Sequence, residues 1–178
     1  AGSISWSGAL RALNADTPNA AKFAAVYLLV NQRWQSGDRL GALEAARRLP
    51  KIAPEVAQAH VALAIETWRE MSALPPTERK AALAEGQAAA QTALRLDPRE
   101  GGAYLAAMLT TPTGLWAERV DWLERGRSID PANTSIDSFL SQLYSSTGQL
   151  SLAFNAIQQA RALDRLSEQK ALWLARLY

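Results

Sequence analysis

Hydrophobic positions in this chain recur at helical spacing and are filled mainly by alanine and leucine. The clearest stretch spans residues 134–165, where apolar side chains recur three or four positions apart within each half: Leu140 and Tyr144, then Ala153, Ile157 and Ala160. The run AEGQAAAQTALRL at residues 84–96 is rich in strong helix formers. Only AVYLLV, at residues 25–30, has a composition that suggests a strand. The pattern predicts an all-α fold.

The helical pattern also repeats along the chain. LRLDP and RSIDP end at Pro98 and Pro131, which are 33 residues apart, and RALDR ends 34 residues further on, at Arg165. Pro54 precedes Pro98 by 44 residues, which is one such period plus an insertion of ten. A period of this length predicts stacked two-helix units. We interpret the whole chain, residues 1–178, as one repeat domain with these units: 23–54, 57–98 with an insertion at 69–78, 101–131, 134–165 and a partial unit at 168–178.

The residues within one unit resemble the tetratricopeptide repeat (TPR). We number the closing residue of the unit 32, so that Thr134 is position 1. The first helix then has a large residue at position 7, a small one at 8, an aromatic one at 11 and glycine at 15, which are Leu140, Ser141, Tyr144 and Gly148. The second helix has alanine at 20, a large residue at 24 and alanine at 27, which are Ala153, Ile157 and Ala160. The resemblance implies antiparallel helix pairs stacked in a right-handed superhelix. It also implies that Gly148 ends the first helix in a left-handed conformation, and that the alanines stay small where two helices cross.

Some positions depart from the repeat. Thr77 follows two prolines and is predicted to cap the second helix of the inserted unit. In the next unit Pro112 is expected to shorten the first helix, Arg119 stands where a small residue is expected, and Gly101 and Gly102 weaken the start of that helix.

A narrower resemblance concerns the order of three segments, APEVAQAHVALAIETW, LPPTERKAALAEGQAAAQTALRLDP and GLWAERVDWLERGRSIDP. The double proline, the alanine-rich helix, the LDP closure and Trp116 are similar to the TPR regions of bacterial winged-helix transcriptional regulators, and of some adenylate cyclases and kinases. The resemblance implies a non-catalytic interaction or sensing domain of a cytoplasmic bacterial regulator, and a chain that is part of a longer protein. The alternatives are the TPR region of a signalling enzyme and a free-standing, periplasmic scaffold for envelope assembly.

Composition excludes several kinds of chemistry. The net charge of +2 is too small for a nucleic-acid footprint, and the absence of cysteine excludes disulfides and thiolate sites. No apolar stretch is long enough for a membrane span. His60 is the only histidine and occupies a packing position, and no nucleotide or hydrolase motif occurs, so we expect no catalytic residue, metal or cofactor.

Three carboxylates follow one another at helical spacing in the third unit: Glu118, Asp121 and Glu124. Because Arg119 and Arg125 alternate with them, this pattern predicts a solvated, ion-paired helix face rather than a carboxylate site.

The resemblance further implies a protein or peptide partner in a concave groove, lined by positions 2, 5, 9, 12 and 13 of the first helices. The residues at these positions that we expect to contact a partner are Tyr27, Asn31, Trp34, Gln35, Ile65, Trp68, Arg69, Gln142 and Arg176. Trp34 and Trp68 both occupy position 12, and they either anchor a peptide or pack between units. The clamp that grips chaperone C-termini requires Lys at position 5, where this chain has Tyr27.

The end of the sequence leads to one more expectation. Leu174, Leu177 and Tyr178 belong to the first helix of a unit whose second helix is missing, so part of their apolar surface lacks its partner. We therefore expect the natural protein to continue past Tyr178, and this chain to self-associate through its C-terminal helix.

Overall fold

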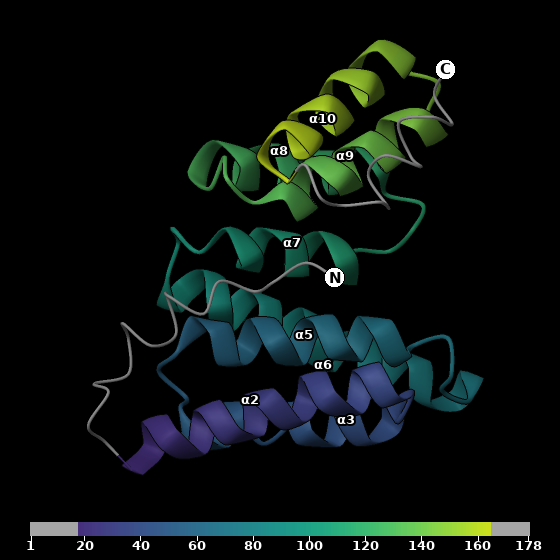
Figure 1. The fold of residues 1–178 in the computed structure, drawn as a ribbon. Coiled ribbons are helices and arrows are strands. Elements are labelled where there is room, and N and C mark those ends of the chain that lie inside the picture. The colour runs from purple at the N-terminus through teal and green to yellow at the C-terminus, as the bar shows by residue number, and fades with distance from the viewer. Residues whose placement is uncertain (1–17, 165–178) are drawn as a thin grey trace.

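The computed structural model describes residues 18–164, and all regular secondary structure in that range is helical (Figure 1). In chain order the helices are α2 (Pro18–Ser36), α3 (Arg39–Ala46), α4 (Leu49–Ile52), α5 (Ala57–Glu70), α6 (Pro76–Leu96), α7 (Gly101–Thr110), α8 (Trp116–Ile129), α9 (Thr134–Ser146) and α10 (Leu150–Leu163). The AVYLLV segment lies inside α2 and forms no strand. The partial unit at 168–178, with Arg176 and the helix expected to self-associate, lies outside the described residues.

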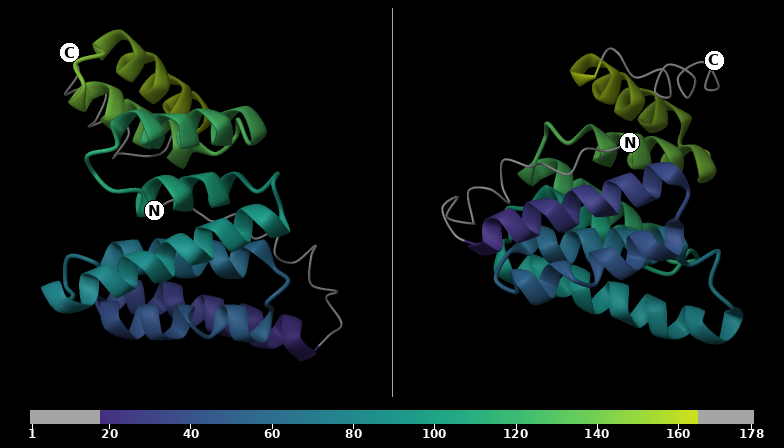
Figure 2. Two further views of the ribbon diagram at one scale, coloured as in Figure 1. Left: turned by 180° about the vertical axis from the view of Figure 1, so that it is seen from behind. Right: turned by 60° about the horizontal axis from the view of Figure 1, so that its bottom comes forward.

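The helices stack in tiers, from the α2–α3 pair at one end to the α9–α10 pair at the other (Figures 1 and 2). Each pair packs internally, and successive pairs contact one another, α3 against α5, α6 against α7 and α8 against α9. This arrangement confirms the predicted all-α fold, in which TPR-type helix pairs form a superhelical stack.

Small residues permit the close helix crossings that build the core. Ala153 and Ala160 of α10 are completely buried. At Gly126 of α8, an added Cβ would lie 2.8 Å from the Cβ of Tyr104 on α7. That distance is far below a normal carbon–carbon contact, so only glycine fits without moving a helix. Small side chains at these crossings are therefore a packing requirement.

Two glycines end helices, and for Gly148 the sequence analysis predicts this role. Gly37 follows α2 with φ of 81°, and Gly148 follows α9 with φ of 77°. Side chains other than glycine rarely adopt this left-handed conformation, and here it reverses the chain into the second helix of each pair.

The insertion in the second unit, residues 69–78, forms the end of α5, a short connection and the start of α6. α5 runs to Glu70, and α6 begins at Pro76 and is 21 residues long, against 14 for α10. The prediction that Thr77 caps α6 is wrong, because Pro75 is the N-cap residue and Pro76 opens the helix. Proline suits this first position because it has no N–H to leave unpaired and its φ is already helical.

The first and third units also show the influence of proline. The second helix of the first unit is broken between α3 and α4, because Pro50 has no N–H to bond the carbonyl one turn earlier. In the third unit, α7 is only 10 residues long and ends just before Thr111 and Pro112, as the sequence predicts.

Candidate functional site

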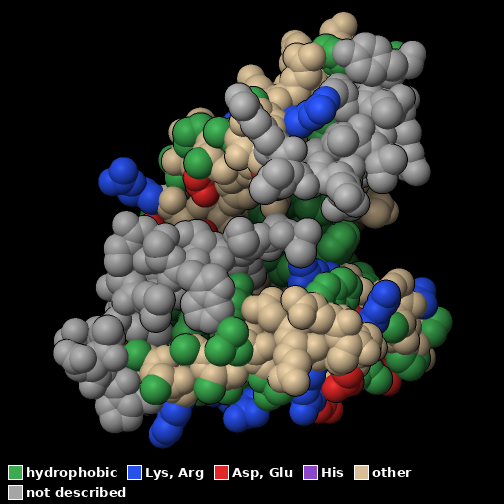
Figure 3. Space-filling view, viewed as in Figure 1, with side chains coloured by type: hydrophobic (Ala, Val, Ile, Leu, Met, Phe, Trp, Pro, Cys, Tyr) green, Lys and Arg blue, Asp and Glu red, His purple; other side chains and the backbone are tan. Residues whose placement is uncertain are grey.

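Three of the predicted contact residues meet at one open cavity of about 770 Å³, which we call the helix-end cavity. Its walls come from the C-terminal ends of α2, α5 and α7, the N-terminal part of α6, and the segments that follow α5 and α7. The lining residues are Trp34, Trp68, Arg69, Met71, Ser72, Arg79, Leu83, Leu109, Thr111, Pro112 and Thr113. In the space-filling view, hydrophobic side chains line a hollow at the right of the molecule, with Lys or Arg side chains beside it (Figure 3). The connection between α5 and α6 lies on this side in Figure 1.

Trp34 is held between arginines. The guanidinium carbon of Arg69 lies 4.5 Å from the centre of the Trp34 ring, and that of Arg39 lies 5.4 Å from it. Arg69 also forms an ion pair with the buried carboxylate of Glu66, one turn earlier on α5. These contacts fix the tryptophan and Arg69 in the wall of the cavity, since cations over an indole face are attracted to it.

Trp68 has a packing role as well as a place in the cavity wall. Its ring meets that of Phe139, on α9, edge to face with the ring centres 6.1 Å apart. This contact joins the second unit to the fourth, so Trp68 contributes to the stack whether or not a ligand is present.

The other predicted contact residues lie elsewhere in the structure. Tyr27 and Ile65 are buried in the core, and Asn31 donates a hydrogen bond to the carbonyl oxygen of Tyr27, at 3.2 Å. Burial raises the pKa of the Tyr27 phenol to about 12. Gln35 is exposed and Gln142 is half-buried on α9, and neither lines the helix-end cavity. Their contact with a partner stays a prediction.

Sequence reasoning missed most of the cavity wall, since only Trp34, Trp68 and Arg69 among its eleven lining residues were predicted. Met71, Ser72, Arg79 and Leu83 belong to the insertion and the start of α6, and the others lie at the early end of α7 and just after it: Leu109, Thr111, Pro112 and Thr113. The signals were present, because the double proline of the insertion and Pro112 both mark places where the repeat geometry changes. The repeat frame places only first-helix positions in a groove, so it did not include these segments.

Two buried carboxylates lie beside this wall. Both oxygens of the fully buried Glu70 side chain, and one oxygen of Glu66, have no hydrogen-bond partner in the described structure. Desolvation raises the pKa of both carboxyls, although the charges of Arg39 and Arg69 partly oppose the rise at Glu70.

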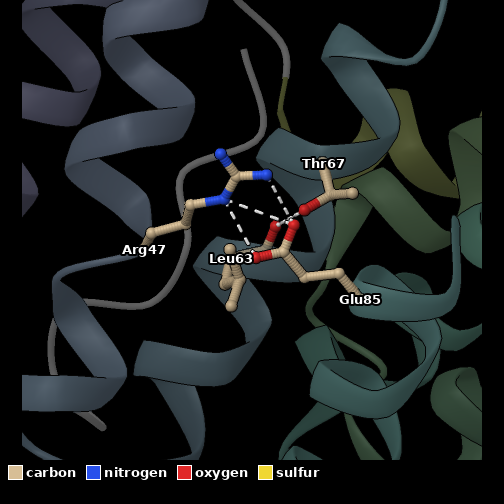
Figure 4. Close-up of polar contacts among 4 residues, drawn as sticks. All are labelled: Arg47, Leu63, Thr67 and Glu85. Atoms are coloured by element: carbon tan, nitrogen blue, oxygen red, sulfur yellow. Dashed lines mark hydrogen bonds and ion pairs between the residues drawn. The ribbon is translucent and has the colours of Figure 1, made fainter. Parts of the chain in front are cut away.

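Polar contacts also join neighbouring units away from the cavity. Arg47, just after α3, holds the Glu85 carboxylate of α6 with two short hydrogen bonds, of 2.9 and 2.7 Å (Figure 4). Tyr144 of α9 donates to Glu124 of α8 at 2.5 Å, and burial with this contact raises the pKa of the Tyr144 phenol to about 12. Such bonds fix the angle between successive pairs.

The predicted ion-paired face of α8 is only partly present. Asp121 pairs with Arg125 at 3.6 Å, as expected. Arg119 is instead buried, and it donates to the carbonyl oxygen of Met108 on α7 at 3.4 Å. The prediction for Arg119 is wrong because position 20 faces the partner helix, so even a charged side chain there points inward. Desolvation lowers the pKa of this guanidinium.

The remaining polar residues offer little chemistry. The Nε2 atom of His60 lies 2.9 Å from the carbonyl oxygen of Pro54, which is a local structural bond. Within residues 18–164, no three side chains of the metal-binding types come together. None of the helices described is both long and apolar enough to cross a membrane.

Comparison with known structures identifies the class of fold. The two-helix units and their stacking are those of TPR proteins. The chain is similar to TTC0263, a thermophilic TPR protein in Thermus thermophilus, with a TM-score of 0.77, 20% identity and coverage of 94% of this chain and 85% of that one. It is also similar to MamA 41-end from Desulfovibrio magneticus RS-1, with a TM-score of 0.53, 17% identity and coverage of 88% and 83%. No protein-family model and no curated protein matches the sequence. At these identities the likeness concerns the fold.

Proposed function

We propose that the chain is a non-catalytic protein-interaction domain that binds a peptide segment of a partner protein. The main support is the helix-end cavity, an open hollow in a TPR-type stack with two tryptophans and two arginines in its wall. Tryptophan and arginine are the residue types most enriched where protein partners bind tightly.

The chemistry of the described residues supports a binding role over a catalytic one. The one histidine bonds a backbone carbonyl, and arginines or Tyr144 hold several of the carboxylates. A catalytic site would require a nucleophile or a base with a positioned partner beside the cavity. Hydroxyls and arginines are the reactive side chains in its wall.

Selection from a displayed library of random peptides tests this function directly. We expect wild-type protein to enrich specific peptides, and Trp34→Ala to lose most of their affinity in calorimetry while its helical circular dichroism is retained. The control variant is Gln91→Ala, at an exposed position of α6 outside the cavity wall. Failure to enrich any peptide, or equal affinity of the two variants, would contradict the proposal.

We further propose that this domain is the sensing or partner-binding region of a bacterial transcriptional regulator, acting in the cytoplasm. The support is the order of the double-proline insertion, the LDP closure and Trp116 along the sequence. The alternatives are a signalling enzyme, such as an adenylate cyclase or a kinase, and a periplasmic scaffold for envelope proteins. The coding sequence upstream of Ala1 distinguishes them: a winged helix supports the regulator, whereas a cyclase, a kinase or a signal peptide contradicts it.

A further inference from the structure

The described wall of the helix-end cavity carries positive charge and no negative charge. Its wall contains Arg69 and Arg79, and none of its described lining residues is acidic. Arg69 is already neutralised by Glu66. Arg79 instead donates to two backbone carbonyls, those of Leu74 at 2.9 Å and Ser72 at 3.4 Å, and within residues 18–164 no carboxylate pairs with it. Among the described lining residues, Arg79 is therefore the arginine whose charge remains for a ligand.

Most of the remaining wall is apolar. Leu83, Leu109, Met71 and Pro112 add to the tryptophans, and a volume of about 770 Å³ is ample for a large apolar side chain. Methionine adapts its shape to different apolar groups. The cavity therefore combines an apolar space with one available guanidinium.

The open shape of the helix-end cavity favours an extended ligand over a small molecule. A small molecule binds well where the pocket encloses most of its surface. The helix-end cavity is a hollow at the surface, so it would cover only one side of such a molecule. A longer chain can insert one side chain and lie across the rim, where the exposed residues Ser72 and Thr113 offer hydroxyl groups.

We propose that the helix-end cavity binds an acidic peptide segment, which places a bulky apolar side chain between Trp34 and Leu83 and a carboxylate on Arg79. This inference rests on the proposed function and adds the chemical class of its partner. It also assigns the charge recognition to Arg79, whereas Arg69 has a positioning role through its contacts with Trp34 and Glu66.

The peptides enriched on wild-type protein provide the test. We expect them to share Asp or Glu next to a large apolar residue. Replacing that acidic residue by its amide should weaken binding about tenfold on wild-type protein, because about one charge-assisted contact is lost. The same replacement should hardly change the affinity of the Arg79→Gln variant, because this variant has already lost the guanidinium that contacts the carboxylate. Lys80→Gln, the neighbouring exposed cation on α6, should behave like wild-type protein.

A second variant guards against an effect of Arg79 on the loop that it bonds. Thr113→Glu adds a negative charge at an exposed rim position and leaves the bonds of Arg79 intact. It should weaken acidic peptides about tenfold, and less at high salt. Enrichment of neutral or basic peptides would overturn the inference. So would an amide replacement that weakens binding equally on wild-type protein and on Arg79→Gln. Either result would leave the proposed interaction function intact. If no peptide is enriched at all, the proposed function fails as well.

Discussion

At the scale of single residues, the structure depends on contacts that leave no room for one more carbon. Gly126 is the clearest example, because the Cβ of Tyr104 lies only 2.8 Å from the position that a Cβ on residue 126 would take. We expect Gly126→Ala to lower the free energy of unfolding by about 1–2 kcal/mol, as overpacking outweighs the gain in helix propensity. Urea denaturation measures the change. The control Gly114→Ala meets nothing within 4 Å and should be neutral or slightly stabilising. Equal losses in both would contradict the packing account.

Glu70 predicts a dependence of stability on pH. Burial raises its folded-state pKa above the ordinary value of 4.5, so the folded state binds this proton more tightly than the unfolded state. The contribution of protonated Glu70 to the free energy of unfolding is therefore present at low pH, and it is lost as the pH rises through the folded-state pKa of this carboxyl. Glu66 contributes in the same direction, while Arg39 and Arg69 reduce the effect at Glu70.

We therefore expect Glu70→Gln to be more stable than wild-type protein at neutral pH, by about 1 kcal/mol, and to show a smaller pH dependence above pH 4.5. Thermal unfolding across this range measures both. Glu44→Gln, at an exposed position of α3, is the control. A pH profile that is the same in Glu70→Gln and wild-type protein would show that the buried carboxylate is neutralised by other means.

At the scale of helices, the crossing of α9 and α10 tests the repeat pattern. Ala153 is fully buried, and Ala153→Leu should destabilise the protein by about 1–3 kcal/mol through overpacking. Gln158→Ala, on the exposed side of the same helix, should change stability by less than about 0.5 kcal/mol. The two variants should separate clearly in urea midpoints. Coincident midpoints would mean that α10 does not pack through this face.

The sequence predicts helices well where the repeat is regular, and less well where it is interrupted. Ala153 and Gly148 lie where the pattern predicts, because helix crossing and chain reversal restrict those residues locally. The course of the insertion was not predictable from the period, since the pattern does not say whether ten extra residues extend α6 or form a loop. Arg79 lies just after that insertion, so its place in the cavity wall depends on tertiary structure.

At the scale of the whole molecule, the helix-end cavity is a product of stacking. Its wall combines residues of the first three units, Trp34 from the first, Trp68 and Arg79 from the second and Leu109 from the third. No single helix pair contains the site. Since each unit in such a stack contacts mainly its neighbours, the relative angle of these three tiers sets the shape of the cavity.

Hydrogen–deuterium exchange with a selected peptide tests the central claim most directly. The account predicts that bound peptide slows amide exchange in the segment between α5 and α6, residues 71–75, and at residues 109–113, which include the end of α7 and the segment that follows it. It predicts no change in α10, residues 150–163, which is remote from the cavity wall. Protection confined to α9 and α10, or spread over the exposed second helices with none at these two segments, would show that the helix-end cavity is not the binding site.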